Sequence, residues 1–265
     1  MQATPDPLSE PIGGYRIDLL FRGFPGKATH HGGLGWSSVV LMRGHSRTVL
    51  IDTGPFGYRR ELVLRLAEKG VAPDQVTDLV LSHGHHDHMV NFPMFSNARI
   101  YVGARELSWA LEIDPGVTPV PELYVQALSR HTRLVTIRDG DTVLPNITAH
   151  LAPGHTPGSL FLVLAGEDRD IIFTADAAKS RAELMSRQAD MTLDAALSAA
   201  TMEKIWSVWR RRAGSIVIPG HDAPLLLLGD EVLLLYPRLG GIAASFGDTL
   251  EDVTTIDLVP PKGRN

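Results

Sequence analysis

One short motif constrains this chain more than any other feature. Between Ser82 and His88 it reads Ser-His-Gly-His-His-Asp-His, so that His83, His85, Asp87 and His88 fit the pattern His-x-His-x-Asp-His. Four side chains of the metal-binding type in six positions are costly to hold together unless a cation offsets their repulsion. The apolar segment just before the motif predicts a buried strand, which a purification tag or an accident of composition would not supply. The motif therefore predicts a metal site built at the end of a strand.

Three more candidate ligands occur later in the chain. His155 lies in the turn Ala-Pro-Gly-His-Thr-Pro-Gly-Ser, while Asp176 and His221 each follow an apolar, strand-like run. The intervals are 67 residues from His88 to His155, 21 to Asp176 and 45 to His221. Because all of these positions are turns or strand ends, we expect the side chains to lie on rigid supports that suit fixed coordination.

These motifs resemble those of the metallo-β-lactamase superfamily, in its dinuclear hydrolase branch of lactonase-like and glyoxalase II-like enzymes. All seven positions that the branch uses as ligands are filled. The resemblance implies a first metal bound by His83, His85 and His155, a second metal bound by Asp87, His88 and His221, and Asp176 as a bridge between them. It also implies that Asp52, in Ile-Asp-Thr-Gly, supports the metal site from outside the ligand set.

The same resemblance covers roughly residues 15–225 and implies the fold class. We expect an α/β protein, a four-layer αββα sandwich of two mixed β-sheets flanked by helices. With 265 residues, one domain spanning 1–265 is the simplest organisation, since enzymes of this class reach such a size.

The ligand types indicate the metal and the chemistry. Imidazole nitrogen and carboxylate oxygen suit two Zn²⁺ ions, and Mn²⁺, Fe²⁺ or Co²⁺ are also compatible. Two cations about 3.5–4 Å apart can share a hydroxide at neutral pH, which would attack a carbonyl or phosphoryl centre. The resemblance implies that Asp87 orients this water or carries its proton to the leaving group.

Composition limits the function and the surroundings. The chain has no cysteine, which excludes disulfides, iron–sulfur clusters and thiolate zinc sites. A net charge of −5 argues against a nucleic-acid partner. The beginning of the chain lacks the features of a signal peptide, and no apolar run reaches the 18 or so residues that span a membrane. We therefore expect a cytoplasmic enzyme with a small-molecule substrate and no membrane partner.

The substrate is predicted from the spacing of the candidate ligands and from one residue, Lys179, that differs from the pattern of the resembling lactonases. The ligand intervals resemble those of lactonases better than those of glyoxalases, so a lactone is the leading substrate, followed by a thioester or other acyl compound and then a phosphodiester. Lys179 stands where acyl-homoserine lactonases commonly have a tyrosine that contacts the substrate carbonyl. Two interpretations of Lys179 are equally weighted: it binds a substrate oxyanion or carboxylate, or it is a lysine at a helix start that reaches solvent.

Two hypotheses lie outside hydrolysis. Sulfur dioxygenases, which are iron-dependent redox enzymes, share the short motif but use one metal, and the complete second ligand set argues against them. A metal-binding regulator without turnover is the other alternative. Metal content would distinguish the first hypothesis, and turnover would distinguish the second.

Several segments carry expectations that concern packing. We predict a helix over residues 58–69 with Leu62, Leu64 and Leu66 as apolar positions, and a long helix over 193–212. The buried stripe of the long helix is expected to be Leu197, Ala200, Ile205, Val208 and Trp209, with Trp206 and Trp209 as core residues rather than a binding site.

Three further segments have two interpretations each. The glycine-rich loop 23–35 either borders the active-site mouth, as in resembling enzymes, or is an ordinary connection. The proline-rich segment 112–132 either covers the cleft, with Leu123 or Tyr124 lining it, or stiffens a surface connection. The leucine runs after His221 either pack on the fold or join a homodimer interface.

Overall fold

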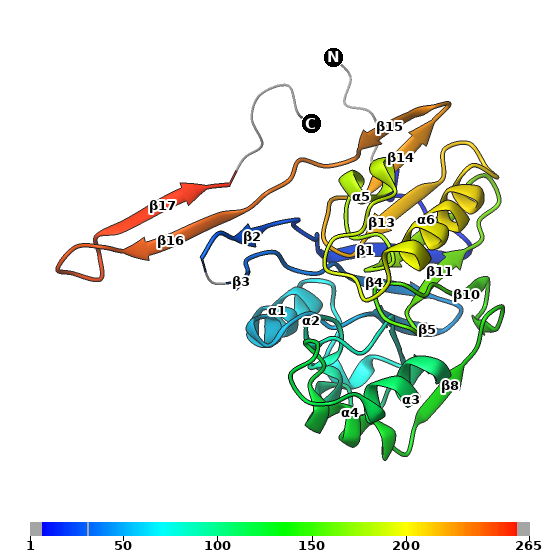
Figure 1. The fold of residues 1–265 in the computed structure, drawn as a ribbon, viewed down its shortest axis with the longest axis horizontal. Coiled ribbons are helices and arrows are strands. Elements are labelled where there is room, and N and C mark those ends of the chain that lie inside the picture. The colour runs from blue at the N-terminus through cyan, green and yellow to red at the C-terminus, as the bar shows by residue number, and fades with distance from the viewer. Residues whose placement is uncertain (1–6, 31, 259–265) are drawn as a thin grey trace.

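The computed structural model describes residues 7–30 and 32–258, and its strands form two mixed sheets (Figure 1). The first sheet, in spatial order, consists of β1 (Tyr15–Phe21), β4 (Val39–Gly44), β5 (Arg47–Ile51), β6 (Asp78–Leu81), β7 (Arg99–Gly103) and β8 (Leu134–Ile137). The second consists of β15 (Glu231–Leu234), β14 (Leu225–Leu228), β13 (Ile216–Pro219), β12 (Ile171–Ala175), β11 (Leu160–Leu164), β10 (Ile147–Leu151) and β9 (Thr142–Leu144). The helices are α1 (Arg59–Glu68), α2 (His86–Met89), α3 (Ala104–Glu112), α4 (Glu122–Ser129), α5 (Arg181–Ser186) and α6 (Ala195–Trp209).

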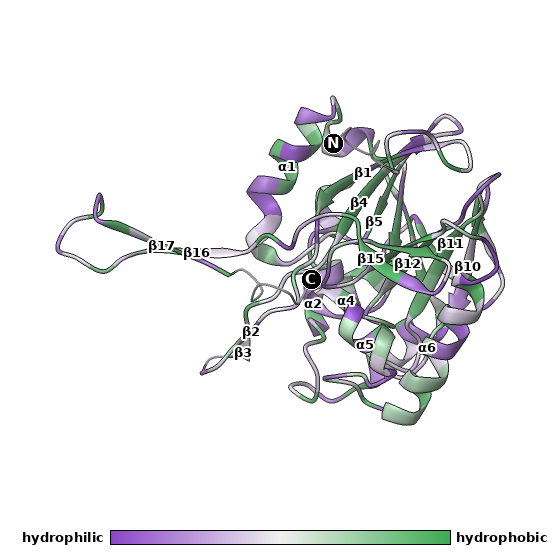
Figure 2. Ribbon diagram, turned by 90° about the horizontal axis from the view of Figure 1, so that it is seen from above, coloured by the Kyte–Doolittle hydropathy of each residue, from purple (hydrophilic) through white to green (hydrophobic). Residues whose placement is uncertain are grey.

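The alternation of side chains along the strands builds the layers. In β4, Val40 and Met42 belong to the cluster between the two sheets, whereas Val39 and Leu41 belong to the cluster under the helices α1, α3 and α4. Successive strand residues point to opposite faces, so an unbroken apolar strand must be covered on both. Figure 2 shows these strands as the hydrophobic interior of the body.

The second sheet is covered in the same way by α5 and α6. Phe161 and Ile172 pack in a cluster with Leu184 of α5 and with Met202 and Trp209 of α6. The inter-sheet cluster takes Leu160, Leu162 and Leu164 from the alternate positions of β11. The order helix, sheet, sheet, helix confirms the predicted four-layer αββα sandwich.

The predicted helices are present, but their buried faces differ from expectation. α1 buries Leu62 and Leu66, while Leu64 is exposed, because residues two apart on a helix do not share a face. In α6 the prediction that Trp206 and Trp209 are core residues is confirmed.

The predicted stripe of α6 was wrong at its N-terminal end. Leu197 and Ala200 are exposed, whereas Ser198, Thr201 and Met202 are buried. The helix begins at Ala195, with the Asp194 side chain accepting a hydrogen bond from the Leu197 backbone N–H, and its first turns lie beside the His155 turn, where small polar residues fit the close approach. Hydropathy alone therefore assigned the wrong face.

Segment 112–132 contains α4, a helix that its prolines did not predict. Val125 and Leu128 bury themselves under the first sheet, and Pro119 accepts a hydrogen bond from the His86 backbone N–H at 3.0 Å. Tyr124 packs edge-on against Phe56, and Leu123 is 77% exposed. The segment therefore braces the loop that contains the histidine motif.

After His221 the chain first completes the second sheet and then leaves the body. The leucine runs form β14 and β15, so the interpretation in which they pack on the fold is confirmed. β16 (Gly241–Ser245) and β17 (Val253–Asp257) pair with each other alone and project from the body as a hairpin (Figures 1 and 2), which the sequence did not predict. We call residues 239–258 the arm. Within residues 7–30 and 32–258, none of the helices has both the length and the apolarity that a bilayer crossing requires.

Candidate metal centre

The histidine motif occupies the carboxyl end of β6. The strand ends at Leu81, His83 and His85 lie in the following loop, and α2 begins directly after His85, whose extended backbone starts the helix. The first turn of α2 then carries Asp87 and His88. The side chains of His83, His85 and His88 are buried, so they have little freedom to move away.

The other three predicted ligands approach from the second sheet. His155 lies in the turn between β10 and β11, Asp176 directly follows β12, and His221 follows β13 after one intervening residue, Gly220. Two backbone features position the Asp176 side chain. Ala175 has a φ of 42°, and residue 220 is a glycine, at which a Cβ would lie only 2.3 Å from Asp176 Oδ1. The structure thus brings together all seven residues. They fall into three overlapping groups whose ligand atoms lie within 4.8 Å of one another: His83, His85 and His155; His83, His88 and Asp176; and Asp87, His88 and His221.

The two carboxylate oxygens of Asp176 face different groups. Oδ2 lies 3.2 Å from His155 Nε2, and His155 Nε2 in turn lies 2.9 Å from His85 Nδ1. Oδ1 lies 3.2 Å from His88 Nε2 and 3.2 Å from His221 Nε2. His221 Nε2 also lies 3.3 Å from Asp87 Oδ2. This division of one carboxylate between two groups is the arrangement that the predicted bridging role of Asp176 requires.

The residues fit a pair of cations. Nε2 of His83, Nε2 of His88 and Oδ1 of Asp176 are buried and have no hydrogen-bond partner among the described residues, although buried polar atoms in proteins are nearly always paired. Zinc–nitrogen bonds of about 2.0–2.1 Å in a tetrahedral site place ligand atoms roughly 3.3 Å apart. The observed separations of 2.9–3.3 Å around Asp176 agree with that spacing.

The histidines of the first group are neutral. Burial lowers the pKa of His83 well below its usual value, of His85 to about 3 and of His155 to about 4, and neighbouring imidazoles add to the shift for His83 and His85. A neutral imidazole is the form that binds a metal. The first group is therefore ready for a cation at neutral pH.

In the group formed by Asp87, His88 and His221, the pKa values of the histidines are shifted in the opposite direction. Burial acts to lower the pKa of His221, but the carboxylates of Asp176 and Asp87 outweigh it and raise the value to about 9. The pKa of His88 is raised by the same carboxylates against the effect of burial. The pKa values of Asp87 and Asp176 are lowered. Burial acts to raise them, but the neighbouring histidines outweigh this effect. A cation that binds here must displace the protons of the His88 and His221 imidazoles, so its binding would release protons to the solvent.

Asp52, predicted from the resemblance as a support, lies behind the ligands. Its carboxylate accepts hydrogen bonds from His88 Nδ1 at 2.7 Å, and from the backbone N–H and hydroxyl of Ser82 at 2.8 Å each. The Ser82 hydroxyl also lies 3.0 Å from His83 Nδ1. Such contacts fix which ring nitrogen faces the metal and how the ring is oriented.

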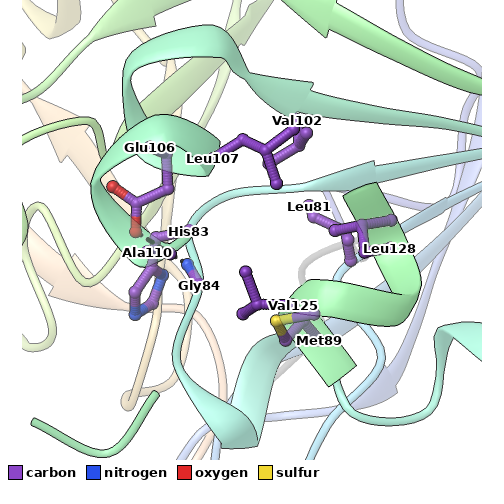
Figure 3. A pocket seen from close by; sticks show the side chains of 10 residues that line it. All are labelled: Leu81, His83, Gly84, Met89, Val102, Glu106, Leu107, Ala110, Val125 and Leu128. Carbon is purple, nitrogen blue, oxygen red and sulfur yellow. Dashed lines mark hydrogen bonds between the residues drawn. The ribbon is translucent and has the colours of Figure 1, made fainter. Parts of the chain in front are cut away.

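Sequence reasoning missed Glu106, a fully buried carboxylate on α3. It accepts hydrogen bonds from the Gly84 N–H at 2.8 Å, the Thr156 hydroxyl at 2.7 Å and the Gly158 N–H at 3.0 Å. Gly84 lies between two ligands and Thr156 follows a third, so one side chain ties the two ligand loops together. Figure 3 shows its carboxylate turned toward His83 and Gly84 at the edge of a small apolar cavity.

The sequence held little signal for this role. A glutamate in the first turn of an amphipathic helix is typical of a solvated position. The one available hint was Gly158. A Cβ at this position would lie 2.1 Å from the Glu106 backbone nitrogen, so α3 can approach the turn that contains Gly158 only because this residue is glycine.

Glu106 supplies a pH-dependent test. Burial raises its pKa to about 7, and the three hydrogen bonds only partly oppose the shift. Because the pKa is higher in the folded state than in the unfolded state, the stabilising contribution is complete below about pH 4.5 and is lost as the pH rises through about 7. The difference in free energy of unfolding between wild type and Glu106→Gln is expected to fall by up to about 1.4 kcal/mol per pH unit in this range.

Urea unfolding from about pH 5 to about pH 8 measures this difference. Glu112→Gln, at the exposed end of the same helix, is the control and should give a constant difference. A constant difference for Glu106→Gln as well would show that its buried carboxyl does not titrate in this range.

The side chain of Lys179 is 14% exposed, but its Nζ is buried, which contradicts the interpretation as a lysine that reaches solvent. Its Nζ lies 3.0 Å from Glu183 Oε1, in a direction that does not make a hydrogen bond, and its charge contributes to the low pKa of His155. The Glu183 carboxylate also accepts hydrogen bonds from the backbone N–H groups of Lys179 and Asp190.

The loop 23–35, described except for residue 31, lies at the edge of the site. It contains the short hairpin of β2 (Lys27–Ala28) and β3 (Gly32–Gly33), and Phe24 stacks on Trp36 with ring centroids 4.7 Å apart. Lys27 forms an ion pair with Asp190, the neighbour of Met191, whose carbonyl lies 3.0 Å from His155 Nδ1. The loop is therefore tied to the segment whose Met191 carbonyl contacts a candidate ligand.

A family model described as the metallo-beta-lactamase superfamily matches residues 32–252, and the chain belongs to this superfamily. Among its relatives is the Xenopus laevis protein metallo-beta-lactamase domain-containing protein 1, 47% identical over 66 residues, which are 24% of this chain and 28% of that protein. The Rattus norvegicus protein of that name is 26% identical over 254 residues, 85% of this chain and 92% of the relative.

Two lactonases are also similar to this chain. The N-acyl homoserine lactonase of Bacillus thuringiensis is 24% identical over 158 residues, 59% of this chain and 60% of that enzyme. The solved structure of a dizinc quorum-quenching lactonase superposes with a TM-score of 0.61 and 19% identity, over 75% of this chain and 79% of that chain. At this identity, the superposition demonstrates a shared fold. The chain is thus a metal-dependent hydrolase by family, and its substrate is a separate question.

Proposed function

We propose that this protein is a dinuclear zinc-dependent hydrolase that cleaves an ester-type bond, with a lactone as its substrate. The observation that carries the proposal is the division of the Asp176 oxygens between two histidine groups, because a bridged pair of cations is what the resemblance to the dinuclear hydrolase branch implies. The similarity to lactonases and the ligand spacing support the lactone.

The proposed ligands have distinct tasks. His83, His85 and His155 would hold one cation, Asp87, His88 and His221 the other, and Asp176 both. When bound, the two cations supply a water of lowered pKa and a Lewis acid for the carbonyl oxygen. Asp52 and Glu106 position the loops from outside.

Asp87 is the proposed proton carrier. Its side chain is 19% exposed, whereas those of His88 and Asp176 are almost completely buried, so this carboxylate borders both the ligands and the space open to a substrate. The Ser37 hydroxyl donates a 2.6 Å hydrogen bond to the Asp87 backbone carbonyl, which holds the backbone from which the side chain extends. Asp87 would accept a proton from the attacking water and donate it to the leaving oxygen.

A pH-stat assay with a panel of lactones tests the proposal. Zinc-loaded protein is expected to release acid from at least one lactone, and chelator-treated protein is expected to lose this activity and regain it when zinc returns. Protein shown to hold two metals that releases no acid would contradict the lactone, and thioesters and phosphodiesters would then be assayed in the same way. Absence of turnover on all three would favour the metal-binding regulator.

Lys179 is the proposed contact for a negatively charged substrate group. Its buried ammonium has an unused hydrogen-bonding capacity and lies beside His155. A charge-assisted hydrogen bond to a carboxylate or oxyanion contributes roughly 1.5–3 kcal/mol.

Lys179→Met tests this role, since methionine keeps most of the side chain's volume without the charge. The KM for a substrate that carries a carboxylate is expected to rise about 10–100-fold, while that for its neutral ester analogue changes little. Lys204→Met, on the exposed face of α6, is the control. Equal effects on both substrates would remove Lys179 from substrate binding.

A further inference from the structure

The arm is the least supported element of the described structure. It is a two-stranded sheet with all but one of its strand residues exposed, and an isolated two-stranded hairpin is marginally stable in water. Ile242 and Ile256 lie directly opposite each other across the two strands. At the far end, Phe246 is 72% exposed and Leu250 is 85% exposed. Apolar side chains at this density on a projecting hairpin require a partner.

The charge of the arm narrows the choice of partner. Residues 239–258 contain Asp248, Glu251, Asp252 and Asp257 and no lysine or arginine. Pairing of two arms would place like charges together, and an anionic membrane would repel them. The partner surface must therefore be apolar and basic.

α1 presents such a surface. Arg60, Val63, Leu64 and Ala67 follow the spacing i, i+3, i+4, i+7, which places them on one face of the helix, and all four are exposed. Phe56, just before the helix, is exposed as well. Over residues 59–69 the chain has four basic residues and two acidic ones, and within the described structure Arg60 forms no ion pair. Helix α1 thus exposes Val63 and Leu64 beside Arg60 on its outward face, opposite the buried Leu62 and Leu66.

We propose that the protein forms a homodimer in which the arm of each copy lies on the outward face of α1 of the other. The arm leaves the body on the side where α1 lies (Figures 1 and 2), so a two-fold axis would bring both arms to both helices at once. Phe246 and Leu250 cover Val63 and Leu64, and Glu251 faces Arg60. Because of the two-fold symmetry each contact between an arm and α1 occurs twice, so the dimer buries twice the area of a single contact. This assembly is independent of the proposed chemistry.

The mass in solution is the first test, by light scattering and sedimentation of the full chain. The expected mass is twice 28.8 kDa. A mass of 28.8 kDa at every concentration up to about 100 μM would overturn the proposal.

Substitutions locate the interface. Phe246→Asp combined with Leu250→Asp, and separately Leu64→Asp, are each expected to raise the dimer dissociation constant by at least about 30-fold. Leu123→Asp is the control, because Leu123 is equally exposed but lies on α4. Reversal of charge at Glu251→Arg or Arg60→Glu should weaken the dimer about 2–5-fold, and the two together should restore it. A dimer unaffected by all of these variants would place the interface elsewhere.

The absence of cysteine permits a direct geometric test. A chain with Leu250→Cys and Leu64→Cys is expected to form a covalent dimer on mild oxidation, whereas Leu250→Cys with Leu123→Cys is expected to remain monomeric on a denaturing gel. Equal cross-linking in the two proteins would contradict the proposed pairing of the arm with α1.

Discussion

Asp176→Asn is expected to lower kcat/KM on the order of 10³-fold or more, with little change in the overall fold. The amide has almost the same shape as the carboxylate, but it is neutral and offers one oxygen in place of two. Because Oδ1 and Oδ2 face different histidine groups, the substitution removes the proposed shared ligand and takes away one of the carboxylate charges that raise the pKa of His88 and His221. The metal content, measured by mass spectrometry, should fall below two per chain.

Asp168→Asn, an exposed aspartate between β11 and β12, serves as the control for loss of one negative charge. Near-normal turnover by an Asp176→Asn protein shown to hold two metals would refute the bridged assignment. Loss of turnover with both metals retained would assign Asp176 a role in the reaction itself and not in metal retention.

Gly220→Ala is expected to be equally severe, although Gly220 is not a ligand. An added Cβ would lie 2.3 Å from Asp176 Oδ1 and 2.6 Å from the Ala175 carbonyl carbon, so the strand end and the bridging side chain must both move. Insertion of atoms into a filled site costs about 1–3 kcal/mol of stability. We expect a lowered Tm, a metal content below two and turnover near background.

Gly57→Ala is the matched control, because a Cβ at that position meets no atom within 4 Å and the backbone there is not left-handed. A Gly220→Ala protein with normal metal content and turnover would demonstrate that the end of β12 yields without disturbing the site.

The convergence of the candidate ligands could be predicted from the sequence because each of them has a local signature. The motif from His83 to His88 is contiguous, and Asp176 and His221 follow strands whose apolar runs are unmistakable. Parallel pairing of β12 with β13 then brings the last two to the same edge. The division of these residues between two metals came from the resemblance to the superfamily and not from the local signatures.

Glu106 and the arm lack such signatures. The role of Glu106 depends on two loops, more than fifty residues apart, that converge on it, and its own neighbours indicate a surface helix. The arm has neither a strong alternation of apolar and polar residues nor a hairpin turn of the commonest kinds, so its strands have little to distinguish them from a tail. The buried face of α6 was misassigned for a similar reason, since proximity of the His155 turn, and not hydropathy, places Ser198 inside.

The origin of the ligands has a consequence for assembly. Four come from the first sheet and three from the second, so neither half of the chain can complete the site before both sheets have docked. Binding of the predicted pair of cations would then be a late event in folding, and the bound pair would stabilise the docked state of the two sheets by its binding free energy. A cell that runs short of the metal would accumulate chains whose halves separate more readily, and for such chains metal supply would set not only activity but lifetime.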